Sequence, residues 1–105
     1  MSLHAPEHLG VEVTNALRRL RNQRLLGESE AALALQGFAS LAIQLWPFEP
    51  LAARTWELGH NVSSFDGAYV ALAERLSAPL FTADRRLARA SGPACSFEVF
   101  GDDHR

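Results

Sequence analysis

The segment from residue 61 to residue 84 constrains the fold of this chain most strongly. A helical pattern runs from about Phe65 to Leu76, and the short apolar strand Leu80-Phe81-Thr82 follows it closely. A helix followed at once by such a strand is typical of an α/β unit with a parallel sheet. The segment also places Asp66 at the start of the helix and Asp84 just after the strand, at the edge where such sheets bind ligands.

The rest of the chain continues this alternation of helices and strands. The patterns predict strands at about residues 3–6, 43–48, 80–82 and 96–100, and helices at about residues 7–25, 29–42, 50–59, 65–76 and 85–90. Pro6 ends the first strand, Gly27 separates the first two helices, and Ser63 or Ser64 can cap the helix near residue 65. We therefore expect a single α/β domain over residues 1–105, with a parallel sheet flanked by helices.

The composition is that of an ordinary globular protein, with 48% hydrophobic and 21% charged residues. No apolar run reaches the roughly 20 residues that a membrane helix needs. The N-terminus lacks the basic start and long apolar stretch of a secretory signal. The single Cys95 excludes an internal disulfide and is most simply a small, half-buried thiol. These features indicate a cytoplasmic protein without a membrane partner.

Apolar residues at helical spacing predict which helix faces point inward. In the first helix they form a stripe that consists of Leu9, Val13, Ala16, Leu17 and Leu20. In the helix near residues 50–59 the inward positions are Leu51, Thr55 and Leu58. Glu12 lies on the flank of the first stripe, so it is either a surface residue at the edge of the core or a functional group at the rim of a cleft.

The charges exclude a protein that is basic as a whole, but they are unevenly placed. The net charge is -2 and the pI is near 6.0, and all ten basic residues are Arg. Two predicted helices hold most of them: Arg18, Arg19, Arg21 and Arg24 in the first, and Arg85, Arg86 and Arg89 in the last. These clusters are either solvated helix faces in a protein encoded by GC-rich DNA or contacts for phosphate groups.

Three carboxylates are candidates for a functional site. Taken singly, each has a structural explanation: Asp66 as a partner of the helix dipole, Asp84 as the N-cap of the last helix, and Glu12 as a surface residue or a partner of Arg19. Taken together, they would repel one another at one sheet edge unless a cation lay among them. Mg²⁺ and Mn²⁺ prefer such carboxylate oxygens, so the three residues predict a divalent metal site.

Such a metal site would suit the hydrolysis of phosphodiesters, because a divalent ion lowers the pKa of water and offsets charge on phosphate oxygens. Asn61, Ser63 and Thr82 are the polar residues that could orient these carboxylates or water, although strand and cap hydrogen bonds explain each of them too. A zinc site at His4 and His8 is disfavoured, because Pro6 interrupts their spacing. The segment Asp102-Asp103-His104 is interpreted as a frayed end.

Three segments of the chain resemble the PIN-domain ribonucleases of the VapC toxin type. Leu3-His4-Ala5-Pro6 with Val11-Glu12-Val13-Thr14-Asn15-Ala16-Leu17 resembles the second strand and following helix of that family. Phe65-Asp66-Gly67-Ala68-Tyr69 resembles its second motif, where Tyr-Asp-Ala is usual. Leu80-Phe81-Thr82-Ala83-Asp84-Arg85-Arg86-Leu87 resembles its third motif. The resemblance covers nearly the whole chain, and the order and spacing of the segments also fit.

The resemblance implies a toxin ribonuclease that cuts RNA with Mg²⁺ or Mn²⁺ held by four acidic residues. Glu12, Asp66 and Asp84 match three of these four positions. It also implies a homodimer that a small VapB-like antitoxin neutralises. Arg19, Arg85 and Arg86 would then hold the RNA backbone.

The chain departs from the family at the fourth acidic position, an Asp in an N-terminal strand. The sequence begins where the family has its second strand, so the resemblance implies an N-terminally truncated PIN-like domain. The strand at Leu3–Ala5 and the strand at Leu80–Thr82 would each lack a neighbour. Either the chain is a fragment, or a dimer repairs the gap by exchange of a segment.

Two functions follow, according to whether the chain is active without the fourth acidic residue. The first is a metal-dependent endoribonuclease, the toxin of a type II toxin–antitoxin system, that acts through Glu12, Asp66 and Asp84. The second is a catalytically inactive PIN-like fragment that serves as a dimerisation or antitoxin-binding module. A domain without any site is a third and simpler alternative.

Overall fold

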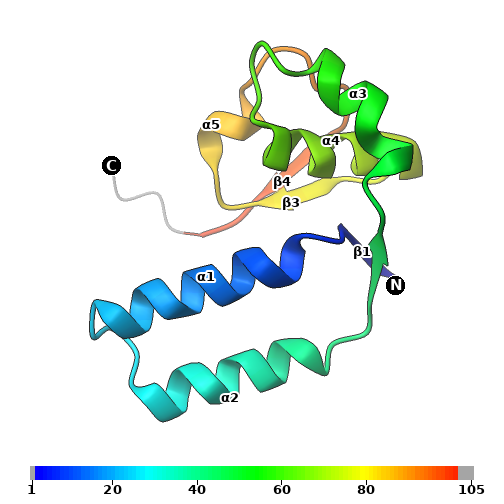
Figure 1. Cartoon of the computed structure of the whole chain (residues 1–105). Coiled ribbons are helices and arrows are strands. Elements are labelled where there is room, and N and C mark those ends of the chain that lie inside the picture. The colour runs from blue at the N-terminus through cyan, green and yellow to red at the C-terminus, as the bar shows by residue number, and fades with distance from the viewer. Residues whose placement is uncertain (1, 102–105) are drawn as a thin grey trace. The chain divides into compact units, whose positions relative to one another are not determined.

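The computed structural model describes residues 2–101, and the chain divides into two compact units. The first unit ends at Trp46, and the second begins at Pro47. Each unit contains one pair of parallel strands with helices between them in sequence (Figure 1). The structure is therefore an α/β fold, as the sequence predicts, and the two units are described separately below. The segment Asp102-Asp103-His104 lies outside the described residues.

The first unit is a helical hairpin between two parallel strands. Its elements are β1 (Leu3–Pro6), α1 (Leu9–Asn22), α2 (Glu28–Ala39) and β2 (Ile43–Trp46). The pairing of β1 with β2 starts at Leu3 with Ile43 and ends at Pro6 with Trp46. Trp46 donates its indole N–H to Nδ1 of His4 at 3.1 Å, which links side chains of the two strands. This bond occupies an imidazole that the sequence disfavours as a zinc ligand.

The predicted core stripe of α1 is only half-buried in the structure. No residue of α1 is fully buried, and Ala31 is the only buried residue of α2. Within this unit the two helices pack along each other. Because each helix has a single helical neighbour there, its apolar face is covered on one side only. The prediction that this stripe forms a core is therefore wrong, although the helix itself is present.

The second unit contains more elements and a buried centre. Its elements are η1 (Glu49–Leu51), α3 (Ala52–Glu57), α4 (Ser64–Leu76), β3 (Leu80–Thr82), α5 (Arg85–Ala88) and β4 (Phe97–Val99). Strand β3 pairs in parallel with β4, from Leu80 with Phe97 to Thr82 with Val99. Helix α4 packs against α3 and against β3, so it forms the middle of this unit (Figure 1).

The core of the second unit is built around α4. Its buried cluster consists of Leu58, Val62, Val70 and Leu87. The inward positions predicted for the preceding helix are confirmed, since Leu51, Thr55 and Leu58 are at most 5% exposed. Cys95 packs against the cluster and is partly buried, and this burial raises the pKa of its thiol. The expectation of a half-buried structural thiol is confirmed.

The parallel strands form two separate pairs, where the sequence predicts one continuous sheet. Within residues 2–101, β1 pairs only with β2, and β3 pairs only with β4. The parallel direction is confirmed.

Most element boundaries lie within three residues of the predicted ones. Helix α1 is shorter at both ends than the predicted residues 7–25, and Arg24 takes a left-handed conformation in the turn that follows it. The helix predicted for residues 50–59 starts as the 3-10 turn η1. Among the residues described, 2–101, no helix is both long and apolar enough to cross a membrane.

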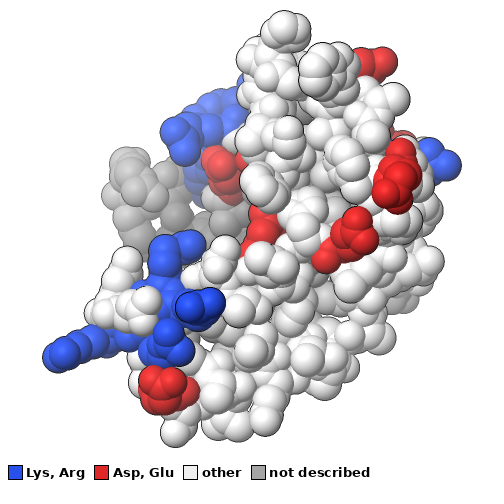
Figure 2. Space-filling view, viewed as in Figure 1, with Lys and Arg blue, Asp and Glu red and all other residues white. Residues whose placement is uncertain are grey.

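Basic side chains gather in two places on the surface. In Figure 2 they lie over α5 and over the C-terminal half of α1. The sequence places Arg85 and Arg86 in α5, and it places Arg18, Arg19 and Arg21 in α1. The clusters predicted from the sequence therefore exist within each unit.

The contact between α3 and α4 depends on a glycine. A Cβ atom built on Gly67 would lie 3.2 Å from Cγ2 of Thr55, which is tighter than most contacts of a real Cβ. Thr55 is 5% exposed and donates its hydroxyl to the carbonyl of Leu51 at 2.7 Å, so it has little freedom to move. Gly67 thus allows the close approach of the two helices directly beside Asp66.

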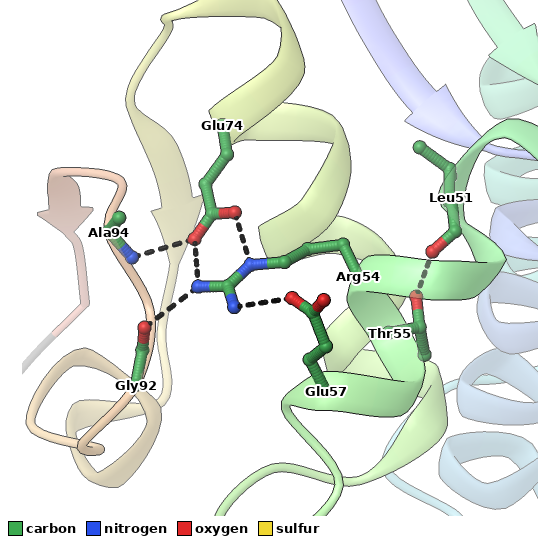
Figure 3. A network of polar contacts seen from close by, with 7 residues as sticks. All are labelled: Leu51, Arg54, Thr55, Glu57, Glu74, Gly92 and Ala94. Atoms are coloured by element: carbon green, nitrogen blue, oxygen red, sulfur yellow. Dashed lines mark hydrogen bonds and ion pairs between the residues drawn. The ribbon is translucent and has the colours of Figure 1, made fainter.

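A polar network ties α3 and α4 to the loop before β4 (Figure 3). The Arg54 guanidinium donates to both carboxylate oxygens of Glu74, at 2.7 Å from Nε and 3.0 Å from Nη2. Arg54 also donates to the Gly92 carbonyl at 2.9 Å, while the Ala94 N–H donates to Glu74 at 2.7 Å. Glu57 accepts a further bond from Arg54 at 3.2 Å. Three segments that are distant in sequence are therefore held at one point.

The charges of this network stabilise each other. The bond from Arg54 lowers the pKa of the Glu74 carboxyl, although burial opposes the shift, and the Ala94 N–H lowers it further. The bond to Glu74 in turn raises the pKa of the Arg54 guanidinium. Gly92 supplies its carbonyl with φ at 110°, a conformation that favours glycine, and a Cβ there would lie 3.3 Å from Cδ2 of Leu58.

Replacement of Gly67 by Ala should destabilise the second unit by about 1–3 kcal/mol, because the added methyl group overpacks the contact with Thr55. Urea denaturation at pH 7 measures the change. Gly37→Ala is the matched control: Gly37 lies within α2, and an added Cβ would have nothing within 4 Å, so that variant should gain about 0.5–1 kcal/mol. Equal changes in the free energy of unfolding for Gly67→Ala and Gly37→Ala would contradict the close contact between Gly67 and Thr55.

Replacement of Glu74 by Gln should cost about 1–2 kcal/mol at pH 7, because the bidentate bond to Arg54 loses its charge. The folded pKa of Glu74 lies below its unfolded value of about 4.3. Its contribution is therefore complete above about pH 4.3 and is lost as the pH falls through the folded pKa. Denaturation curves between about pH 7 and pH 3 should show a flatter acid limb for Glu74→Gln than for the wild type.

Glu57→Gln is the control for this pH dependence. Glu57 contacts the same guanidinium, but its side chain is 64% exposed against 16% for Glu74. Its replacement should change stability by less than about 0.5 kcal/mol, since exposed ion pairs contribute little. If both variants changed the acid limb alike, the Glu74 carboxylate would not be the group that causes the loss of stability at low pH.

Candidate active site

Two predicted site carboxylates lie at the same end of the second unit. Helix α4 ends at Ser77, which takes a left-handed conformation with φ at 51°, and the chain turns back into β3. Because α4 and β3 run in opposite directions and pack together, the start of α4 and the end of β3 lie at one end. Figure 1 shows the starts of α4 and α5 at this end. Asp66 and Asp84 therefore share the carboxyl edge of the β3–β4 pair.

Asp66 is held in the first turn of α4. Ser63 is the N-cap, and its Oγ accepts the backbone N–H of Asp66 at 3.1 Å. The Asp66 side chain is half-buried at the positive end of the helix dipole. The helix-dipole role that the sequence allows for Asp66 is thus present. The same geometry fixes the direction in which its carboxylate leaves the backbone.

Asp84 is the N-cap of α5. Its Oδ1 accepts the backbone N–H groups of Arg86 at 2.9 Å and of Leu87 at 3.3 Å. The hydroxyl of Thr82 accepts the N–H of Asp84 at 3.0 Å, and the Asp84 side chain is 46% exposed. Oδ2 of Asp84 accepts neither of the two capping bonds. The cap therefore orients this carboxylate while one of its oxygens takes no part in capping.

The three polar residues suggested as supports differ in position. Ser63 and Thr82 each accept the backbone N–H of one carboxylate residue, so both help to place the acidic side chains. Asn61 donates its own N–H to the carbonyl of Leu58 at 3.1 Å, and its side-chain amide lies beside Gly92. The structure thus connects Ser63 and Thr82 directly with the acidic residues and places Asn61 next to the polar network.

Glu12 belongs to the first unit. It lies in the first turn of α1 with its side chain 40% exposed, and its Oε1 is 3.9 Å from Nε2 of His8. In neither unit do three or more described His, Cys, Asp or Glu side chains come close enough together to hold a metal ion. The structure therefore supplies two of the predicted carboxylates from one unit and the third from the other.

Arg86 is a strongly exposed cation beside Asp84. Its side chain is 89% exposed, and its Nε lies 4.0 Å from Oδ1 of Asp84. Arg85, one residue earlier in α5, is partly exposed, and Arg19 is exposed on α1. Such an exposed contact contributes little to stability, which leaves the Arg86 guanidinium available to a dissolved anion. Positive charge thus lies next to the carboxylate end of the second unit.

The Arg54–Glu74 network is a feature that sequence reasoning missed. Arg54 and Glu74 are twenty residues apart, and the loop at Gly92 lies farther on. No periodicity of the sequence relates them, because the contact forms only after α3 packs on α4. The useful signal is a Glu on the mostly buried helix α4, since a carboxylate in that setting requires a cation nearby.

Comparison with known proteins identifies relatives over most of the chain. The model of the PIN domain family matches residues 2–93. Ribonuclease VapC12 of Mycobacterium tuberculosis is 39% identical over 98 residues, which cover 93% of this chain and 76% of that protein. Ribonuclease VapC9 of the same organism is 39% identical over 97 residues, covering 92% and 76%, and ribonuclease VapC1 is 41% identical over 97 residues, covering 91% and 73%.

These matches cover both segments that carry the acidic residues of the second unit. They include α4 with Asp66 and the segment from β3 to α5 with Asp84, since both lie within the matched residues. The parallel strand pairs with intervening helices agree with an α/β fold of this kind. The chain therefore belongs to the PIN domain family and, within it, to the VapC type.

Proposed function

We propose that this chain is an RNA-cleaving toxin of a type II toxin–antitoxin system. The observation that carries the proposal is the placement of Asp66 and Asp84 at one end of the second unit, each oriented by the start of its own helix. Relatives of the chain carry the name ribonuclease at 39% and 41% identity. An oriented acidic pair beside exposed arginine suits the cleavage of a phosphodiester.

The acidic residues fit Mg²⁺ or Mn²⁺. Both ions prefer carboxylate oxygens, and Oδ2 of Asp84 lies outside the capping bonds. In the proposal, Asp66 and Asp84 hold the ion together with Glu12 from the first unit. When bound, the ion supplies charge that lowers the pKa of water and stabilises negative charge on the phosphate.

The remaining roles belong to residues around the acidic pair. Ser63 and Thr82 keep the backbone of Asp66 and Asp84 in place through their hydroxyl groups. Exposed guanidinium groups would bind the phosphates on either side of the cleaved bond, as Arg side chains do in many nucleic-acid complexes. We assign this role to Arg85, Arg86 and Arg19, and a supporting role to Asn61.

The proposal also includes partners. A VapB-like antitoxin would neutralise the protein in the cytoplasm, and two copies of the chain would form a homodimer. Support for both comes from the likeness to the VapC ribonucleases. The exposed apolar side chains of α2, Leu33 at 66% and Leu35 at 38%, are consistent with a further protein surface on this helix.

Asp66→Asn and Asp84→Asn should each reduce RNA cleavage at saturating Mn²⁺ by about 100-fold or more, because each removes a charged ligand. A 5′-labelled RNA resolved on a denaturing gel measures the rate. Glu49→Gln is the control, since Glu49 is an exposed carboxylate in η1 that the proposal does not use, and its activity should be unchanged. Wild-type rates in either Asp variant would refute the site.

Mn²⁺ should raise the melting temperature of the wild type in a saturable manner, since an ion that binds only the folded state stabilises it by about 2.7 kcal/mol at roughly 100 times its Kd. The shift should shrink in Glu12→Gln as well as in Asp84→Asn. A shift that survives in Glu12→Gln would remove Glu12 from the metal site. A metal-induced shift without RNA cleavage would instead favour an inactive module that binds antitoxin.

A further inference from the structure

Asp66 and Gly67 form the one Asp-Gly pair of the sequence, which contains no Asn-Gly pair. In a flexible chain an Asp-Gly pair isomerises readily, because glycine has no side chain that hinders attack of its nitrogen on the preceding carboxyl group. The contact between α3 and α4 favours glycine here, since a Cβ on residue 67 would lie 3.2 Å from Cγ2 of Thr55. The packing of the second unit therefore keeps a reactive pair at a residue of the proposed site.

The isomerisation of such a pair proceeds through a five-membered ring. The backbone nitrogen of Gly67 attacks Cγ of the protonated Asp66 carboxyl group, so that the N–Cγ bond forms and the C–OH bond breaks. The hydroxyl leaves with the amide proton as water. A second water opens the succinimide: attack at Cγ restores aspartate, whereas attack at the backbone carbonyl carbon breaks its bond to nitrogen and leaves isoaspartate. Water is the only other reactant.

The first turn of α4 opposes this ring closure in the folded chain. The Gly67 N–H donates to the carbonyl of Ser63 at 2.7 Å, and the Asp66 N–H donates to Oγ of Ser63 at 3.1 Å. These bonds belong to a helical turn, where ψ is about −42°, whereas the ring requires a ψ angle far from that value. The bond between Gly67 and Ser63 must therefore open before the ring can close. Both bonds and the contact with Thr55 lie within the second unit.

We propose that Asp66-Gly67 is a site of spontaneous isomerisation that the first turn of α4 controls. Helix ends open locally at a much lower free energy than the core of a domain. Opening of this turn breaks the two bonds to Ser63, while the bond between Arg54 and Glu74 farther along α4 stays in place. The ring can therefore close without unfolding of the whole unit.

Isoaspartate at residue 66 changes both the helix start and the carboxylate. Its backbone runs through Cβ and Cγ, which adds one carbon between Ser63 and Gly67, so their hydrogen bond loses its helical register. The free carboxylate is then attached directly to Cα, one carbon closer to the main chain than in aspartate. The consequence for activity rests on the proposed function, in which Asp66 holds the cation, and there the nuclease loses a metal ligand each time the ring opens to isoaspartate.

The first experiment measures isoaspartate in the unfolded chain. The wild type is incubated in mildly acidic guanidinium chloride, and isoaspartate at each position is quantified by mass spectrometry with electron-transfer fragmentation. Residue 66 should convert at least about tenfold faster than Asp84, which Arg85 follows, and Gly67→Ala should remove this excess, because a Cβ hinders ring closure. Equal conversion at the two positions of the wild type would overturn the proposal.

The second experiment measures the same conversion in the folded chain without denaturant. The rate at residue 66 should be about 10- to 1,000-fold lower than in denaturant. Ser63→Ala should raise this folded-state rate by about two- to 30-fold, the factor that corresponds to the loss of an N-cap. Glu74→Gln is the matched control, since it destabilises the same helix away from the first turn, and its rate should stay within about twofold of the wild type.

The outcomes separate this proposal from the proposed nuclease. Equal acceleration by Ser63→Ala and Glu74→Gln would overturn control by the first turn, because the whole unit would then have to unfold. Equal rates with and without denaturant would overturn it too. If Asp66 binds the cation, Mn²⁺ at roughly ten times its Kd should slow the folded-state conversion by about tenfold. A rate unchanged by Mn²⁺, with the Ser63→Ala effect intact, would support control by the turn and refute the metal site at Asp66.

Discussion

The bidentate bond between Arg54 and Glu74 is the interaction on which the second unit depends. It joins α3 to α4, and through Gly92 and Ala94 it fixes the loop that leads into β4. This loop precedes β4, the parallel partner of β3. The loop that leads into β4 is therefore held by a polar contact, in addition to the packing of Cys95 and Phe97 on the hydrophobic cluster.

The acidic residues combine structural and chemical roles. Asp84 caps α5 through Oδ1, and the backbone of Asp66 is bound by the cap of α4. The capping bonds hold the Asp84 carboxylate in one orientation, while the bond to Ser63 holds the backbone of Asp66. Glu12 lies in the first turn of α1, in the other unit, with its Oε1 at 3.9 Å from Nε2 of His8. The two carboxylates of the second unit are thus the ones whose backbone positions are set by hydrogen bonds at helix starts.

Much of this arrangement could be predicted from local sequence, and the remainder could not. The bounds of β3, the capping role of Ser63 and the inward positions Leu51 and Leu58 follow from patterns within a few residues. The division of the strands into two pairs and the Arg54–Glu74 bond depend on contacts between distant segments. The half-buried stripe of α1 failed as a core prediction for the same reason, because periodicity identifies an apolar face but not what covers it.

The helix N-termini explain why Asp66 and Asp84 can both carry a negative charge at one end of the unit. Asp66 lies in the first turn of α4 and Asp84 caps α5, so each carboxylate faces the positive end of a helix dipole. Arg86 adds a full positive charge at 4.0 Å from Asp84. These groups offset the negative charge of both residues, so the fold itself does not require a metal. In the proposed function, a divalent cation would therefore bind carboxylates whose charge the helix ends already offset.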